Sequence, residues 1–452
     1  MSKEIQKDNA GLIYAEEPAW VTEDPVAAAR RRKRETPLKT LSRRTFLMKS
    51  SATLGGLAVL GLAGCRKDDA GRSADDFPKP LTKAKTVTSG YIPIVDSTPI
   101  PVAFAKDFFK EFGLRAERPV LIRGWAPLLE AFASNQILLT HVLLFQVIFM
   151  RYEQKLPIRS IAFNHQNGVA LLGGPGVTSF EELGGTVVGC PIWWAPHTLL
   201  LQESLRAVGL KPIVNKPGQR IQPDEVAFRV ISPPDMPNAL KTGAISGAVV
   251  SEGFGAVSEL LAESTLLRMS GDIWRNHPCC QSVMMQYTID QDPSWAQAVT
   301  LAIAKACTWC EQNREEMVEI LSKDGGGYFP LDKGALHRGC NHTSLEEYGV
   351  TTGTGAIRHP EWNVKRLGLN PFPYPSAFEL AVSLMKNNVV DPSVALTDQL
   401  KSLDPKKAAE DIVEYEFIKE AIKQVGGIEQ FIGDDDSVNP DNPYEREEQF
   451  EV

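Results

Sequence analysis

Apolar residues between positions 86 and 251 follow two patterns that alternate along the chain. Short apolar runs bounded by Gly, Pro or polar residues are typical of buried strands, whereas apolar positions three and four residues apart are typical of helices. The short runs predict strands over residues 86–95, 118–122, 138–144, 158–163, 169–173, 186–190, 228–232 and 247–251. The helical spacing predicts helices over residues 99–112, 125–134, 196–208 and 236–241. Strands that alternate with helices in this way predict parallel sheets covered by helices, an α/β fold.

Beyond Pro293 the helical spacing dominates, and residues 293–321 read as one long helix. Cys307 and Cys310 lie on it in a C-x-x-C arrangement. Positions three apart share a helix face, so the two are expected to be core cysteines, with a redox or metal role as the alternative. The last segment, residues 433–452, holds eight acidic residues against one arginine, and this composition predicts a disordered tail.

The charge of the chain restricts its partners. The formal net charge is −8 and the first 64 residues are net basic, so the rest of the chain is more acidic still. Nucleic-acid binding needs a basic face, and we therefore expect no nucleic-acid partner. A few local hydrogen-bond donors can still hold a small anion in such a body.

The N-terminal region carries the pattern of a processed export signal. Arg43 and Arg44 precede an apolar, Gly- and Ala-rich run, which ends in Leu62-Ala63-Gly64-Cys65. The run is shorter than the roughly twenty residues that span a bilayer. Residues 1–64 are thus expected to be a twin-arginine signal peptide. Residues 65–83 are expected to be the start of the mature protein, in which Cys65 is lipidated and the rest is a linker. A short buried helix is the alternative.

Several motifs, in order, resemble one known family. They include Gly90-Tyr91-Ile92-Pro93, then Asp96-Ser97-Thr98-Pro99, the helix that holds His197, and Pro233 to Met236 followed by Ser251-Glu252. Together they resemble the nitrate/bicarbonate/sulfonate (taurine) substrate-binding proteins of ABC transporters. The resemblance implies a type II periplasmic-binding-protein fold, in which two parallel-sheet lobes joined by a hinge enclose a central cleft. The expected first lobe is residues 84–185 plus 275–432, which include the C-terminal helices, and the second is residues 186–274.

The resemblance also implies a ligand site. Trp125, Gln146, Asn167 and Glu252 match positions of the family's site. Thr98 and His197 are candidates because they lie near expected helix N-termini, which offer N–H groups and partial positive charge to an anion. Each has a structural alternative: Thr98 as a helix cap, Trp125 and His197 as core residues, Gln146 as a helix-surface residue, and Asn167 as a turn residue before glycine. Glu252 could orient a donor, or help bind calcium in bicarbonate-type members. A lone carboxylate is far short of a calcium shell, so neither a metal nor a cofactor is expected.

One departure from the family pattern affects the solute. Nitrate-type members carry a basic residue shortly after the position of Glu252, and here residues 256–262 contain none. An anion would rely on His197, Arg123 and backbone amides, so sulfonate, bicarbonate or an uncharged solute stays open. The chain is therefore expected to be a monomeric, non-enzymatic, lipid-anchored extracytoplasmic protein that delivers a small oxyanion to ABC permease subunits. A thiamine-pyrimidine-type binding protein or synthase, and a ligand sensor, are the alternatives.

Overall fold

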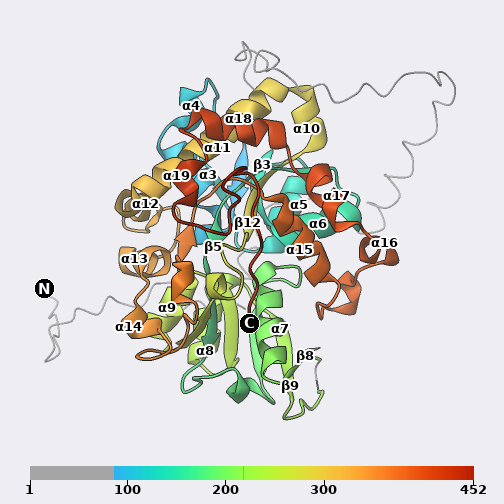
Figure 1. Ribbon diagram of the computed structural model, residues 1–452, viewed down its shortest axis with the longest axis vertical. Coiled ribbons are helices and arrows are strands. Elements are labelled where there is room, and N and C mark those ends of the chain that lie inside the picture. The colour runs from blue at the N-terminus through green and yellow to red at the C-terminus, as the bar shows by residue number, and fades with distance from the viewer. Residues whose placement is uncertain (1–85, 217) are drawn as a thin grey trace, which may run out of the picture. The chain divides into compact units, whose positions relative to one another are not determined.

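The computed structural model describes residues 86–216 and 218–452 (Figure 1). The expected signal peptide and linker lie outside the described residues, namely the segments 1–64 and 65–83 with Arg43, Arg44 and Cys65. Within the described part of the chain, no helix combines the length and the apolar character that a membrane crossing requires.

The first sheet has five strands. Their spatial order is β2 (Val120–Leu121), β1 (Ser89–Tyr91), β3 (Leu139–Leu143), β12 (Cys280–Met285) and β4 (Ile158–Phe163). β1 pairs parallel with β2 and β3, whereas β12 runs antiparallel between β3 and β4. The helices α5 (Trp125–Ala133), α6 (Leu144–Tyr152) and α11 (Pro293–Gln312) contact this sheet. This sheet and its helices form the first lobe.

The second sheet has six strands. Their order is β11 (Thr265–Met269), β6 (Val169–Gly173), β10 (Gly247–Ser251), β7 (Val187–Cys190), β9 (Glu225–Val230) and β8 (Lys211–Val214). The strands β10, β7, β9 and β8 are parallel, and β6 is antiparallel to both β10 and β11. The helices α7 (Pro196–Ala207), α8 (Met236–Lys241) and α9 (Phe254–Leu261) contact this sheet and complete the second lobe (Figure 1).

The α/β fold is confirmed, and four elements, β4, β6, β10 and α8, have the bounds that the hydrophobic pattern predicts. The sheets are mixed rather than wholly parallel. Because β6 belongs to the second sheet, the chain changes lobe before residue 169, earlier than the expected boundary at 186. The helix expected over residues 99–112 is divided into α3 (Pro99–Ala105) and α4 (Phe108–Glu111), since Asp107 between them has a φ of 59°. A left-handed residue cannot continue an α-helix.

The rest of the described chain is mainly helical. It contains α10 (Gln286–Gln291), α12 (Arg314–Leu321), α13 (Lys333–Asn341), α14 (Leu345–Tyr348), α15 (Pro375–Met385), α16 (Asp398–Lys401), α17 (Pro405–Ile412), α18 (Tyr415–Gln424) and α19 (Glu429–Ile432). A small ladder pairs β5 (Gln166–Asn167) with β13 (Leu367–Gly368), which ties the first crossing between the lobes to the C-terminal region. Cys307 and Cys310 are fully buried on α11, as expected of core cysteines.

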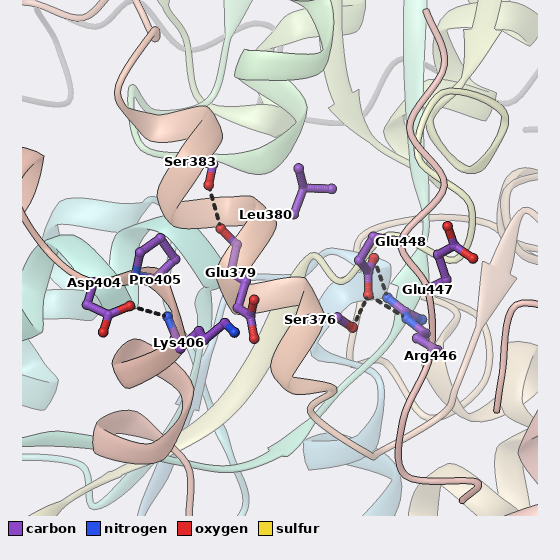
Figure 2. Close-up of a pocket in the computed structure, with 10 residues that line it drawn as sticks. All are labelled: Ser376, Glu379, Leu380, Ser383, Asp404, Pro405, Lys406, Arg446, Glu447 and Glu448. Carbon is purple, nitrogen blue, oxygen red and sulfur yellow. Dashed lines mark hydrogen bonds and ion pairs between the residues drawn. The ribbon is translucent and has the colours of Figure 1, made fainter. Parts of the chain in front are cut away.

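The acidic C-terminal segment differs from its expected disorder. Arg446 is 7% exposed, and its guanidinium donates to Glu448, which also accepts from Ser376 Oγ of α15 at 2.8 Å (Figure 2). Trp274 Nε1 donates to the same Glu448, and Arg275 pairs with Asp435. The carboxylates of this segment thus have specific cationic and N–H partners on the body, so its charges are compensated locally.

Candidate functional site

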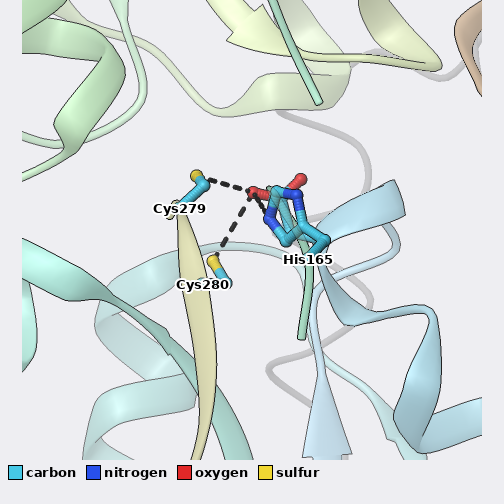
Figure 3. A group of neighbouring side chains, drawn as sticks. His165, Cys279 and Cys280 are labelled. Atoms are coloured by element: carbon cyan, nitrogen blue, oxygen red, sulfur yellow. Dashed lines mark hydrogen bonds and ion pairs between the residues drawn. The ribbon is translucent and has the colours of Figure 1, made fainter. Parts of the chain in front are cut away.

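Polar side chains gather, fully buried, where the two lobes meet. Asp96, His165, Cys279 and Cys280 have potential metal-ligand atoms that all lie within 4.8 Å of one another, and each side chain is buried. Figure 3 shows how His165, Cys279 and Cys280 lie in this group. His197 of the second lobe approaches the group, with Nδ1 3.7 Å from Cys279 Sγ. We call these five residues the junction cluster.

The local structure explains why these residues converge. Asp96 lies in a 3-10 turn after β1, and in the same sheet Cys279 directly precedes β12 and Cys280 is its first residue. His165 lies in the crossing that follows β4, three residues before Gly168. Gly168 has a φ of 79°, and a Cβ at this position would lie 2.8 Å from His165 Nδ1, so only glycine lets the chain cross here beside the histidine.

The second lobe and the crossing fix the orientation of Asp96. Ser251, at the end of β10, donates its hydroxyl to Asp96 Oδ2, and Asn164 Nδ2 donates to the Asp96 carbonyl at 3.0 Å. His165 Nε2 lies 3.3 Å from Asp96 Oδ1, at ion-pair distance although not in hydrogen-bond geometry. The Oδ1 atom therefore faces the histidine and the two cysteines.

Burial and charge act against each other at the cluster. Burial alone would raise the pKa of Asp96, but His165 together with the Ser251 hydroxyl holds this pKa well below its usual range. Burial alone would lower the pKa of His165, but the Asp96 carboxylate raises it to about 10. Burial opposes ionisation of both thiols, and the hydrogen bond between them lowers the pKa of Cys279 while raising that of Cys280. Cys279 is therefore the thiol that ionises first.

Trp125 and His141 present two buried donors without acceptors. Trp125, the first residue of α5, is 5% exposed, its ring lies 5.4 Å from that of His141, and its Nε1 has no partner within the described chain. Burial lowers the pKa of His141 to about 3, so this side chain is neutral at pH 7. Its Nε2 accepts from the Ile92 N–H at 3.0 Å, which puts the proton on Nδ1, and Nδ1 has no partner among the described residues either.

A cavity of about 400 Å³ lies between α5 and α6 of the first lobe and residues 192–194 of the second. Gln146 lines it and is 4% exposed, so its expected alternative as a helix-surface residue is wrong. The other lining residues are predominantly apolar: Ala126, Leu129, Glu130, Ala133, Phe149, Met150, Gln154, Leu156, Ile192, Trp193, Trp194 and Val394.

The remaining expected site residues have other partners. The Thr98 hydroxyl donates to the Val95 carbonyl at 2.7 Å and does not cap α3, so the expected capping role is wrong. Asn167 has a φ of 59°, as a turn residue before glycine does, and its Nδ2 donates to the Lys365 carbonyl at 3.0 Å. His197 is 1% exposed, and its Nε2 has no partner within the described chain.

Glu252 pairs with a buried cation that is distant in the sequence. Arg366 is fully buried and donates from Nη1 to Glu252 at 2.7 Å and from Nη2 to Glu259 at 2.9 Å. The family pattern has a basic residue just after the position of Glu252, whereas the cation that pairs with Glu252 here lies 114 residues further along the chain. Asp96, His141, His165 and the two cysteines were also missed as site residues. For Asp96, His165 and the cysteines the available signal was a position after a strand or at a strand start, where ligand loops of α/β folds lie, whereas His141 lies within β3 and gave no such signal.

Comparisons with known proteins agree with this geometry. The sequence profile described as the NMT1-like family matches residues 82–322. The nitrate/nitrite binding protein NrtA of Nostoc sp. is 26% identical over 279 residues, which are 55% of this chain and 59% of that relative, so the chain spans only about three fifths of the curated relative's length.

Two solved structures share the fold. The periplasmic nitrate-binding protein NrtA from Synechocystis superposes with a TM-score of 0.60 at 18% identity, covering 77% of this chain and 91% of that one. A Candida albicans protein described as having the generic periplasmic binding protein structural fold superposes with a TM-score of 0.50 at 13% identity, covering 73% and 96% of the two chains. The two mixed α/β lobes of this chain therefore have the same fold as these two proteins. Because the profile covers more than half of the sequence, the chain belongs to the NMT1-like family and has the periplasmic-binding-protein fold.

Proposed function

We propose that this protein is the substrate-binding component of an ABC importer and captures a small oxyanion of the nitrate, bicarbonate or sulfonate type between its lobes. The names of the relatives support the class, since the Nostoc protein binds nitrate or nitrite. The protein acts by binding, as a monomer, and hands its solute to permease subunits without a chemical step.

One observation carries the proposal. Trp125 Nε1 and His141 Nδ1 are neighbouring buried N–H donors of the first lobe, and neither has an acceptor among residues 86–216 and 218–452. An unsatisfied buried donor costs about 1–3 kcal/mol, which a bound oxyanion would recover. His197, with its unpaired Nε2, is the matching group of the second lobe. A solute held by groups of both lobes favours the closed arrangement.

The solute class can be tested by thermal unfolding. The panel is nitrate, nitrite, bicarbonate, taurine, short alkanesulfonates and pyrimidines. A true solute at a hundred times its Kd stabilises the folded state by about 2.7 kcal/mol and raises Tm. Since the cavity beside α5 is mostly apolar, we expect alkanesulfonates to raise Tm more than nitrate does. A response to pyrimidines alone would favour the thiamine-pyrimidine alternative, and no response to any anion would contradict the proposal.

Replacing Trp125 by phenylalanine should weaken anion binding by about 10- to 100-fold. The change removes the Nε1–H donor and keeps an aromatic ring against His141, and a hydrogen bond to a charged group is worth about 1.5–3 kcal/mol. Isothermal titration with the best anion of the panel measures the loss. Trp362→Phe, whose indole stacks on His359 and does not line the cavity, is the matched control for loss of an indole. Equal affinity of Trp125→Phe and the unsubstituted protein would remove Trp125 from the site.

We also propose that the protein is exported and anchored to the membrane by acylated Cys65, on the motif of Arg43, Arg44 and residues 62–65. Cells grown with labelled palmitate should label the protein in the membrane fraction, and the label should be absent from Cys65→Ala. Label that persists in this variant would place the lipid elsewhere or exclude the anchor.

A further inference from the structure

Four side chains of the junction cluster have the chemistry of metal ligands. Cys279 and Cys280 offer sulfur, His165 offers nitrogen and Asp96 offers a carboxylate oxygen, and all four are buried. This mixture of two thiols, one imidazole and one carboxylate matches the ligands that Zn²⁺ takes in tetrahedral sites.

The distances fit one central ion. Bonds of about 2.0–2.3 Å at tetrahedral angles separate the donors of a zinc site by about 3.3–3.8 Å. Asp96 Oδ1 lies 3.3 Å from His165 Nε2, 3.3 Å from Cys279 Sγ and 3.5 Å from Cys280 Sγ. Three of the donor pairs therefore already have the separation that a tetrahedral ion imposes.

Two further features indicate a prepared site. His165 Nε2, although close to Asp96, makes no hydrogen bond within the part of the chain that the structure describes, so this fully buried imidazole has no directional partner there on the side of the cluster. The Asp96 carboxylate is held by Ser251 through its other oxygen, Oδ2. Such outer contacts orient the ligands of metal sites and set which oxygen faces the ion.

We propose that Asp96, His165, Cys279 and Cys280 form a buried binding site for one zinc ion at the junction of the lobes. No metal was expected from the sequence, because Glu252 alone is far short of a calcium shell and Cys307 and Cys310 were expected to be core cysteines. The site goes beyond the proposed transport function and does not depend on which solute is carried. Because Ser251 of the second lobe holds the Asp96 ligand, the ion would stabilise the contact between the lobes.

Cobalt titration tests the proposal directly. The full chain, purified without an affinity tag and treated with a chelator, is titrated with Co²⁺ alone, whose thiolate complexes absorb in the near ultraviolet and visible. We expect a thiolate band and tetrahedral visible bands that saturate at one equivalent and disappear when one equivalent of Zn²⁺ is added. Cys279→Ser and Cys280→Ser should each weaken or abolish the band. Cys307→Ser and Cys310→Ser, at the buried C-x-x-C of α11, are the matched controls and should leave it unchanged.

The outcomes separate clearly. The titration of the unsubstituted protein can by itself contradict the proposed ligands. It does so if cobalt binds without a thiolate absorption band, or if the absorbance does not saturate near one equivalent of Co²⁺. A band that survives Cys279→Ser and Cys280→Ser but is lost in Cys307→Ser would move the site to α11. Circular dichroism of each variant distinguishes a lost ligand from a lost fold. The cobalt readout needs no anion and the anion panel can be run with chelator present, so the site and the transport function fail independently.

Discussion

Replacing Arg366 by methionine should lower the free energy of unfolding by about 3–5 kcal/mol. The change leaves the carboxylates of Glu252 and Glu259, whose side chains are 1% and 6% exposed, without their shared cation. Removing one partner of a buried ion pair is strongly destabilising because the other charge stays buried and unpaired. Tyr348 also loses contact, since its hydroxyl accepts from Arg366 Nη2 at 2.6 Å. Urea unfolding measures the change.

The neighbouring Lys365→Met is the matched control. Its ammonium is half-exposed and 4.0 Å from Glu311, so the same substitution there should cost less than about 0.5 kcal/mol. Combining Arg366→Met with Glu252→Gln should recover part of the loss, because the unpaired charge of Glu252 is removed, whereas Glu259 keeps its ion pair with Arg338. If Arg366→Met lowers the free energy of unfolding no more than Lys365→Met does, the ion pair between Arg366 and Glu252 does not contribute to stability.

Deleting residues 433–452 should also destabilise the protein, by about 3–5 kcal/mol. Trp274 Nε1 and the Arg275 guanidinium would lose acceptors on Glu448 and Asp435, and hydrogen bonds to charged groups are worth about 1.5–3 kcal/mol each. The fully buried indole of Trp274 would also lose the Phe450 ring, whose centroid lies 6.3 Å away. The midpoint of urea unfolding of the truncated protein measures the effect.

The matched control for the deletion is Glu447→Gln, which changes an exposed carboxylate of the same segment. It should leave the midpoint within about 0.5 kcal/mol of the unsubstituted protein. A disordered tail, as its composition suggests, predicts instead that the deletion has no effect, so equal midpoints for the truncated and full chains would restore that interpretation.

The site was predictable only in part. Trp125, His197 and Glu252 were identified as candidates from the sequence, and the structure buries all three at the lobe junction or beside it. The partners of these residues were not identified. Glu252 pairs with Arg366, which lies 114 positions away in the sequence. His197 contacts Cys279, which lies 82 positions away. No local pattern encodes such a pairing, since it depends on how the sheets close.

The sequence by itself determined the elements and the class of fold. The hydrophobic rhythm places β4, β6, β10 and α8 correctly, because the period of burial on a strand or helix is a local property of the chain. Only the tertiary structure decided which lobe β6 joins, that the acidic tail is docked, and that Asp96, His165, Cys279 and Cys280 share one buried point. Charge and burial at these positions depend on neighbours distant in sequence. Tertiary packing therefore sets the chemistry of this site.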